Sequence, residues 1–239
     1  MDSRPDDLAA GAFRAWLEEM RAALRHEADA DVPCGDCCAC CSTSHFVHVG
    51  PEEVDALAHI PADLRFPAPG MPAGHEVLGY DQRGRCPMLG DDGRCTIYEH
   101  RPLTCRTYDC RVFAAAGIDA DRDEVTRRAR RWRFACTEPR EGDALTAVSA
   151  AAHWVRGHAA AFPGGAVPEH PAQLAVLAVK AAGVFLPGGP AAEGEDDAAV
   201  AAAIVRAAGE GVDQHEPFSP ATASPSGPRS SGNGDVTGG

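Results

Sequence analysis

The sequence lacks any long apolar run. Its amino terminus is acidic, and the stretch from Leu8 to Leu24 is interrupted by Arg14, Glu18, Glu19 and Arg21. A secretory signal needs an uncharged apolar core of roughly 7–15 residues, and a membrane-spanning helix needs about 20. The sequence therefore predicts a protein that is neither exported nor inserted in a membrane, and hence a cytoplasmic location.

Positive charge is also scarce. The 239 residues include 22 Lys and Arg against 35 Asp and Glu, which gives a formal net charge of −13, and Lys180 is the single lysine. Binding of nucleic acid requires a positive face that can contact phosphates. The composition therefore argues against nucleic acid as the main partner.

Several catalytic signatures are missing. The sequence contains no Gly-x-Ser-x-Gly elbow, no His-Glu-x-x-His helix and no Gly-x4-Gly-Lys phosphate loop, which argues against the hydrolases and nucleotide-binding proteins that use them. A thioredoxin-like oxidoreductase would need a reactive thiol within a βαβ unit. No such unit is predicted around the cysteines of this chain.

Cysteine, in contrast, is abundant. Five of the ten cysteines fall within residues 34–41, and the others are Cys86, Cys95, Cys105, Cys110 and Cys136. Thiolates that share a cation lie within about 4 Å of one another, because zinc–sulfur bonds are roughly 2.3 Å long. A disulfide framework is the main alternative, but it requires an oxidising compartment. The clustering therefore predicts metal ligands.

The spacing of these cysteines favours iron–sulfur over zinc. Cys34-x2-Cys37-x2-Cys40 has the spacing of three ligands of a bacterial ferredoxin cluster, and Cys86-Pro87 resembles the fourth. Two separated Cys-x2-Cys pairs, which are typical of zinc knuckles, are absent. Eight thiolates around two zinc ions remain the alternative, and one metal site with spare redox thiols is a further one. Because the adjacent Cys40 and Cys41 should diverge, they are expected to serve different sites, or one of them no site.

A different pattern suggests an enzyme. Cys34-x3-Cys38-x2-Cys41 has the cysteine spacing of radical S-adenosylmethionine enzymes. Those enzymes build most of a barrel from consecutive βα units. The segments after Cys41 predict short strands followed by alanine-rich helices, so this interpretation is disfavoured.

Apolar periodicity and turn residues predict an α-rich α+β fold. We expect a small irregular cysteine- and metal-centred core with a short hairpin, packed against several helices. Strands are predicted over residues 44–49, 77–80, 85–89 and 94–98. Helices are predicted over 6–28, near 51, from 102 onward, and over 121–136, 143–161, 171–186 and 193–208.

The same patterns suggest a division of the chain. Residues 1–30 are expected to form an amino-terminal helix on the core, 31–140 a cysteine-cluster domain and 141–208 an alanine-rich helical extension. Residues 209–239 are rich in Ser, Gly and Pro and are predicted to be a disordered tail. In the 121–136 helix, Trp132 and Cys136 are expected to face inward, which makes Cys136 either a core residue or a ninth ligand. The arginines are expected to form internal pairs or, alternatively, an anion site.

The order of the cysteines also resembles a known family. Cys34-x2-Cys37-x2-Cys40-Cys41, then Cys86-Pro87, Cys95-Thr96-Ile97-Tyr98, Arg101-Pro102 and Cys105-Arg106-x-Tyr108-x-Cys110 are similar to the YkgJ-type cysteine-cluster family over about residues 30–112. That family is described as zinc- or iron-chelating, and its members are often called iron–sulfur proteins. The resemblance implies eight metal ligands: Cys34, Cys37, Cys40, Cys41, Cys86, Cys95, Cys105 and Cys110. Cys38 and Cys136 lie outside the pattern.

Residues near the cysteines are assigned supporting roles. Arg101 and Arg106 are expected to offset cluster charge and to donate hydrogen bonds to sulfur, with ion pairs to Glu99 or Asp109 as the alternative. His45 and His48 lie on opposite faces of a predicted strand, so surface or hydrogen-bonded roles are favoured over metal ligation.

Two functional hypotheses follow. The first is a metal-binding module that holds an iron–sulfur cluster, with 4Fe–4S preferred, or zinc, and that serves electron transfer or metal handling. The second is an iron–sulfur enzyme of redox or group-transfer type, because the cysteine region is also similar to that of flagellin lysine methylases. An enzyme would need a substrate pocket and open coordination beside the metal, whereas a binding module can be capped entirely by thiolates.

Overall fold

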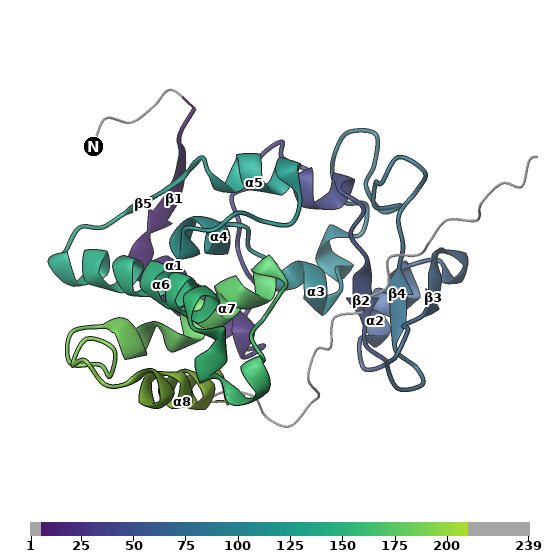
Figure 1. Cartoon of the computed structure of the whole chain (residues 1–239). Coiled ribbons are helices and arrows are strands. Elements are labelled where there is room, and N and C mark those ends of the chain that lie inside the picture. Colours follow the sequence, from purple (N-terminus) through teal and green to yellow (C-terminus); the bar gives the residue numbers. More distant parts are fainter. Residues whose placement is uncertain (1–5, 210–239) are drawn as a thin grey trace, which may run out of the picture.

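The computed structural model describes residues 6–209 and confirms the predicted α-rich α+β fold. Within that range the chain forms eight α-helices and two small sheets (Figure 1). A group of helices occupies one side of the molecule in this view, and a three-stranded sheet occupies the other. Gly209 is the last residue of α8, and the rest of the predicted tail lies outside the described residues.

The larger core is helical. Its buried side chains come mainly from α1 (Phe13–Leu24), α4 (Arg111–Ala116), α5 (Asp123–Ala129), α6 (Pro139–Gly157), α7 (Pro171–Ala181) and α8 (Asp197–Gly209). Alanines such as Ala151 and Ala178 are completely buried, and their small side chains allow neighbouring helices to approach closely. The predicted helices over 143–161, 171–186 and 193–208 correspond to α6, α7 and α8.

Helix ends follow ordinary capping chemistry. Glu138 precedes α6, and its carboxylate and that of Glu141 form a capping box with the backbone N–H groups there. Pro139 occupies the first turn of α6 and Pro171 that of α7, where a missing N–H costs nothing. Gly117 ends α4 with a φ of +66°, a left-handed conformation that favours glycine.

The smaller core lies beneath a three-stranded antiparallel sheet. The strands β2 (Val47–Val49), β3 (Arg65–Pro67) and β4 (Glu76–Leu78) are arranged in the order β2-β4-β3. Helix α2 (Val54–His59) contributes Ala56, which is buried with Val49, Ile60, Leu78 and Ile97. The short helices η2 (Ala62–Leu64), η3 (Tyr98–His100) and α3 (Leu103–Arg106) flank this sheet or follow it in the chain.

A parallel pair of strands corrects two predicted helices. β1 (Leu8–Ala12) pairs with β5 (Trp132–Ala135), and Gly11, with a φ of +91°, lies at an irregularity in their register. The helix predicted over 6–28 therefore begins only at Phe13, and the one predicted over 121–136 ends at Ala129. Trp132 is buried as expected, but Cys136 follows the strand and is exposed, so its predicted inward orientation is wrong.

The predicted hairpin is reduced to a tight turn. Residues 85–89 and 94–98 share a single β-bridge, between Leu89 and Cys95. Two backbone hydrogen bonds close the turn between them: the Gly90 N–H donates to the Arg94 carbonyl, and the Gly93 N–H donates to the Gly90 carbonyl. The N–H of Cys86 instead donates to the Cys41 carbonyl at 2.7 Å. The backbone of this segment therefore pairs over a short length with residues 94–96, where the Thr96 N–H donates to the Met88 carbonyl, and also with the first cysteine motif.

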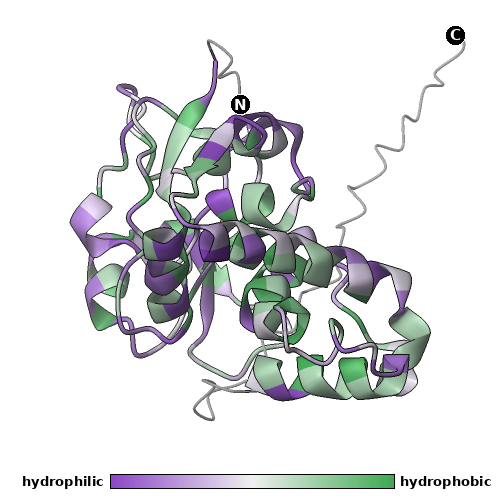
Figure 2. Cartoon of the chain, turned by 90° about the vertical axis from the view of Figure 1, so that its left-hand side faces the viewer, coloured by the Kyte–Doolittle hydropathy of each residue, from purple (hydrophilic) through white to green (hydrophobic). Residues whose placement is uncertain are grey.

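Hydropathy along the helices is mixed. Figure 2 shows most helices with both hydrophilic and hydrophobic stretches, as expected for elements that bury one face. Among residues 6–209, none of the helices combines the length and the apolar character that crossing a bilayer would require.

The remaining short helices are η1 (Ala39–Ser42), η4 (Ala159–Ala161), η5 (Pro163–Gly165) and η6 (Ala182–Phe185).

Candidate metal centre

The cysteines lie where the two cores meet. Cys110 packs against the helical core, whereas Cys86 and Cys95 pack against the core beneath the sheet. Every cysteine except Cys136 is partly buried, and all ten are free thiols. The structure thus brings the amino-terminal motif and the four later cysteines of the predicted ligand set into one region.

One group of thiols faces the helical core. Negative charge on Cys34 and Cys37 contributes to the raised pKa of Cys110. Negative charge on Cys34 and Cys110 contributes in the same way to the raised pKa of Cys40. Burial is the first cause that raises the pKa of Cys34, and the neighbouring Cys37 thiol adds to it. We call Cys34, Cys37, Cys40 and Cys110 the first quartet.

A second group faces the sheet. Burial raises the pKa of Cys105 to about 12, and the nearby thiols of Cys41, Cys86 and Cys95 raise it further. Burial is also the largest cause of the raised pKa of Cys86, and the thiols of Cys41 and Cys95 raise it further. We call Cys41, Cys86, Cys95 and Cys105 the second quartet. Cys41 also acts on Cys34 across the boundary, so the two quartets are adjacent.

Cys40 and Cys41 form that boundary. Both lie in η1, where a turn of about three residues points consecutive side chains in different directions. Their sulfur atoms are still only 3.8 Å apart. A hydrogen bond between the two sulfurs raises the pKa of Cys40 and lowers that of Cys41 to about 7, with help from the positive charge of Arg101. The side chains of Cys40 and Cys41 were expected to point in different directions, yet their sulfur atoms are in contact.

Trp132 and Arg128 support the first quartet. The indole N–H of Trp132 donates to Cys110 Sγ at 3.2 Å, which opposes the effect of burial and leaves the pKa of Cys110 raised to about 11. Arg128 donates to the Cys34 carbonyl at 2.8 Å, and its guanidinium lies 4.8 Å from the centre of the Trp132 ring. The sequence does not indicate either role, because the arginine-rich run is typical of a solvated helix face.

The two arginines predicted to act on the thiols have different surroundings. The charge of Arg101 lowers the pKa of Cys41 and opposes the raised pKa of Cys95 and Cys105. Its guanidinium lies 3.7 Å from the centre of the Tyr98 ring. Arg106 instead donates to Asp29 Oδ1 at 2.7 Å and to the Arg101 carbonyl at 3.1 Å. Arg106 therefore positions the backbone of Arg101.

A buried ion pair holds the segment before the first cysteine. Asp109 and Arg111 are 3% and 5% exposed, and their side chains form a salt bridge of 2.8 Å. Asp109 also accepts a hydrogen bond from the indole N–H of Trp16, while Arg111 donates to the carbonyls of Ala10 and Asp31. These contacts connect β1, α1 and the segment that leads to Cys34. No motif in the sequence indicates this network.

The remaining polar residues of the region bond to protein atoms. Cys38, which lies outside the matched pattern, accepts a hydrogen bond from Ser42 Oγ at 3.5 Å. His45 Nδ1 lies 3.2 Å from the Cys40 carbonyl, and His48 Nε2 lies 2.9 Å from His75 Nδ1. Both histidines are therefore hydrogen-bonded, which is a role that the sequence favours over metal ligation.

The spacing of the thiols differs from that around a single ion. Within residues 6–209, no three cysteine sulfurs lie within 4.8 Å of one another. Four sulfurs around one zinc ion would lie about 4 Å apart, given zinc–sulfur bonds of about 2.3 Å. A cubane cluster separates its thiolates further, because each binds a different iron atom. Both quartets supply the four thiolates that a cubane requires.

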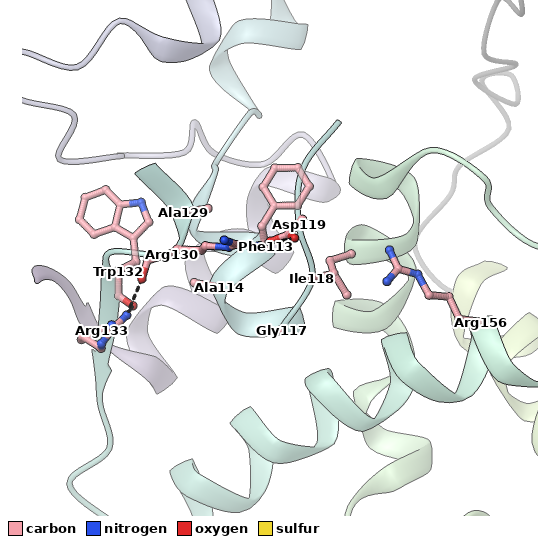
Figure 3. Close-up of a pocket in the computed structure, with 10 residues that line it drawn as sticks. All are labelled: Phe113, Ala114, Gly117, Ile118, Asp119, Ala129, Arg130, Trp132, Arg133 and Arg156. Atoms are coloured by element: carbon pink, nitrogen blue, oxygen red, sulfur yellow. Dashed lines mark hydrogen bonds and ion pairs between the residues drawn. The ribbon is translucent and has the colours of Figure 1, made fainter. Parts of the chain in front are cut away.

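The arginine run forms no common anion site. Its guanidinium groups bond separately to Glu124, Asp119, Asp7, the Asp6 carbonyl and the Cys34 carbonyl. Arg130 and Arg133 do line a hollow of about 530 Å³ together with Arg156 (Figure 3), but Asp119 is there too and pairs with Arg130. The residues that line this hollow include none of the cysteines.

The raised thiol pKa values predict how pH affects the metal-free protein. A thiol whose folded pKa exceeds the usual 9.0 stabilises the fold below pH 9 and loses that contribution as the pH rises toward the folded value. For Cys105 and Cys110 together, we expect the free energy of unfolding to fall by roughly 2–3 kcal/mol between pH 8 and pH 10. Urea unfolding of reduced, metal-free protein measures this change.

Metal-loaded protein is the control for that experiment. Its thiols are deprotonated at both pH values, so its stability should not show the same loss. A metal-free protein that is equally stable at pH 8 and pH 10 would contradict the buried, protonated state of these thiols.

Comparison with known families adds an independent result. Residues 33–131 match the model of the CxxCxxCC family, whose description is "Putative zinc- or iron-chelating domain". No curated protein and no solved structure matches the chain. The resemblance expected from the sequence is therefore confirmed over this segment, which contains all eight thiols of the two quartets.

Proposed function

We propose, from the metal-chelating CxxCxxCC domain at residues 33–131, that the chain binds two iron–sulfur clusters, one in each quartet, and that it serves in electron transfer. Cys34, Cys37, Cys40 and Cys110 would hold the first cluster. Cys41, Cys86, Cys95 and Cys105 would hold the second. When bound, such clusters supply one-electron redox chemistry.

The spacing of the thiols carries this proposal. The sulfurs in each quartet influence one another electrostatically, yet no three of them approach within 4.8 Å in the described part of the chain. The Cys34-x2-Cys37-x2-Cys40 spacing in the sequence matches three ligands of a bacterial ferredoxin cluster and favours iron–sulfur over zinc. Trp132 and Arg101 would then affect the reduction potentials, through an N–H···S bond and a nearby positive charge.

The surroundings favour a binding module over an enzyme. Four thiolates for each cluster leave no open coordination position for a substrate. The fold also lacks, within residues 6–209, the consecutive βα units of radical S-adenosylmethionine enzymes.

Anaerobic purification with metal analysis tests the proposal. We expect brown protein with about eight iron and eight sulfide ions per chain and broad absorbance that bleaches with dithionite. Colourless protein with two zinc ions per chain would overturn the iron–sulfur assignment. Protein that binds neither metal after reconstitution with iron and sulfide or with zinc would overturn metal binding by the quartets altogether.

A further inference from the structure

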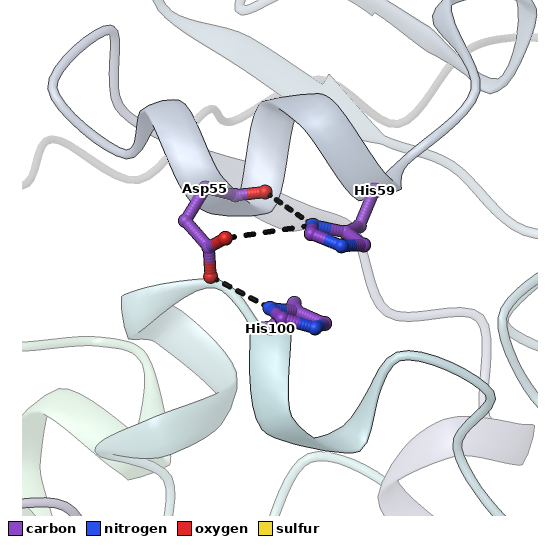
Figure 4. A group of neighbouring side chains, drawn as sticks. All are labelled: Asp55, His59 and His100. Carbon is purple, nitrogen blue, oxygen red and sulfur yellow. Dashed lines mark hydrogen bonds and ion pairs between the residues drawn. The ribbon is translucent and has the colours of Figure 1, made fainter.

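A second kind of donor cluster, built without thiols, lies on the surface. Asp55 and His59 lie one turn apart on α2, and His100 is the last residue of η3 (Figure 4). One ligand atom from each of the three lies within 4.8 Å of the other two. Among the histidine, cysteine, aspartate and glutamate side chains of residues 6–209, no other three meet this distance.

The three side chains already direct their donor atoms toward one another. His100 Nδ1 lies 2.8 Å from Asp55 Oδ2, and His59 Nδ1 lies 3.6 Å from Asp55 Oδ1. Zinc–nitrogen and zinc–oxygen bonds of about 2.0–2.1 Å place neighbouring ligand atoms about 3–3.5 Å apart. The distances from the Asp55 carboxylate to the two rings are therefore close to those around a bound ion.

The protons on both rings can be assigned from their partners. Carboxylate and carbonyl oxygens only accept hydrogen bonds, so His100 Nδ1 donates to Asp55 Oδ2 and His59 Nδ1 donates to the Asp55 carbonyl at 2.8 Å. These contacts and the two nearby imidazoles lower the pKa of Asp55, with the His100 hydrogen bond as the largest cause. Asp55 therefore offers a carboxylate to any cation that replaces these protons.

We propose that Asp55, His59 and His100 bind a divalent first-row transition-metal ion such as Zn²⁺. The ion takes one carboxylate oxygen and Nδ1 of each ring. Each imidazole stays neutral, because its proton moves from Nδ1 to Nε2. Two imidazoles and one carboxylate, with water in the remaining positions, form a recurrent donor set for zinc and ferrous iron.

Exposure of the site permits the adjustment that binding requires. The rings are stacked with centroids 3.5 Å apart and planes only 3° from parallel. Because an imidazole binds a metal close to its own ring plane, the rings must rotate well away from this parallel arrangement before both nitrogens point at one ion. The side chains of Asp55, His59 and His100 are 69%, 40% and 39% exposed, which leaves room for this rotation and for water ligands. Hydrogen bonds between side chains this exposed contribute little to stability by themselves.

The donor set differs chemically from the quartets, so this inference does not depend on them. Imidazole and carboxylate favour harder ions than thiolates do. The two sites are nevertheless connected through the chain, since η3 is followed by Arg101 and then by Cys105 in α3. An ion bound between α2 and η3 would hold the η3 segment against α2.

Calorimetric titration of the metal-loaded protein with Zn²⁺ tests the proposal. With its thiols already occupied, the protein should bind one further Zn²⁺ per chain. His100→Gln and Asp55→Asn should each weaken this binding at least about tenfold. His153→Gln is the matched control, because His153 is also exposed and its Nδ1 also bonds to a backbone carbonyl four residues earlier; its affinity should equal that of the wild type.

Titration with Co²⁺ identifies the ligands. At this site Co²⁺ should give weak visible bands without the intense sulfur-to-cobalt charge transfer that thiolates produce. Absence of a further ion, or unchanged binding in His100→Gln, would overturn the proposal. Because these variants retain all ten cysteines, their iron and sulfide content reports on the quartets separately, and either proposal can fail without the other.

Discussion

Replacement of Cys105 by serine is expected to remove the metal of the second quartet and to leave that of the first. Cys105 is partly buried among Cys41, Cys86 and Cys95, and a serine hydroxyl does not ionise to a comparable ligand near neutral pH. Cys110→Ser should have the reciprocal effect. Each variant should therefore lose about half of its iron and sulfide, and the double variant should lose nearly all.

The two cysteines outside the quartets provide matched controls. Cys38→Ser changes a thiol within the same dense motif that bonds only to Ser42 in the hydrogen bonds described above, and Cys136→Ser changes an exposed one. Both should retain full metal content. Equal losses from Cys38→Ser and Cys105→Ser would refute the assignment of the quartets, as would full metal content in both Cys105→Ser and Cys110→Ser.

Replacement of Arg111 by methionine is expected to destabilise the protein by about 3–5 kcal/mol. The change leaves the buried Asp109 carboxylate without its ion-pair partner, and it removes the donors to the carbonyls of Ala10 and Asp31. Uncompensated charge in such a site is far more costly than the loss of a surface pair. Urea unfolding followed by far-UV circular dichroism measures the effect.

Arg106→Met is the control for that substitution. Arg106 also pairs with an aspartate, but the side chains of Arg106 and Asp29 are 35% and 48% exposed, so the loss should be below about 1 kcal/mol. An Arg111→Met variant as stable as Arg106→Met would show that the buried pair does not hold the fold. A double variant, Asp109→Leu with Arg111→Met, should recover part of the lost stability, because no unpaired charge remains.

The local patterns of the sequence were sufficient to predict most of the fold. Helices α6, α7 and α8 follow from apolar periodicity, and α7 also from Pro171 at its first turn. β1 was missed because Leu8–Ala12 is rich in alanine and favours a helix by itself. Its extended conformation depends on pairing with β5, which lies far away in the chain, and no local pattern reports such a contact.

The sequence predicts a set of candidate ligands for the site, but it does not predict how they are arranged in space. Cysteine order and spacing suggest eight ligands, and the match over residues 33–131 supports a metal-chelating domain. The division into quartets depends on how α3, α4 and the Cys86 turn pack around η1, which is a tertiary property. The hydrogen bond from Trp132 to Cys110 likewise requires a strand at a position where the sequence indicates a helix.

The pairing of β1 with β5 has a consequence for how the chain folds. Leu8 pairs with Trp132, so this contact closes a long loop that contains both quartets. Closing a long loop costs entropy that grows with its length, and contacts of this kind slow folding. Metal bound between Cys34 and Cys110 would already bring distant parts of that loop together and so shorten the segment left to close. Metal should therefore act on the rate at which the sheet forms, and not only on the stability of the finished fold.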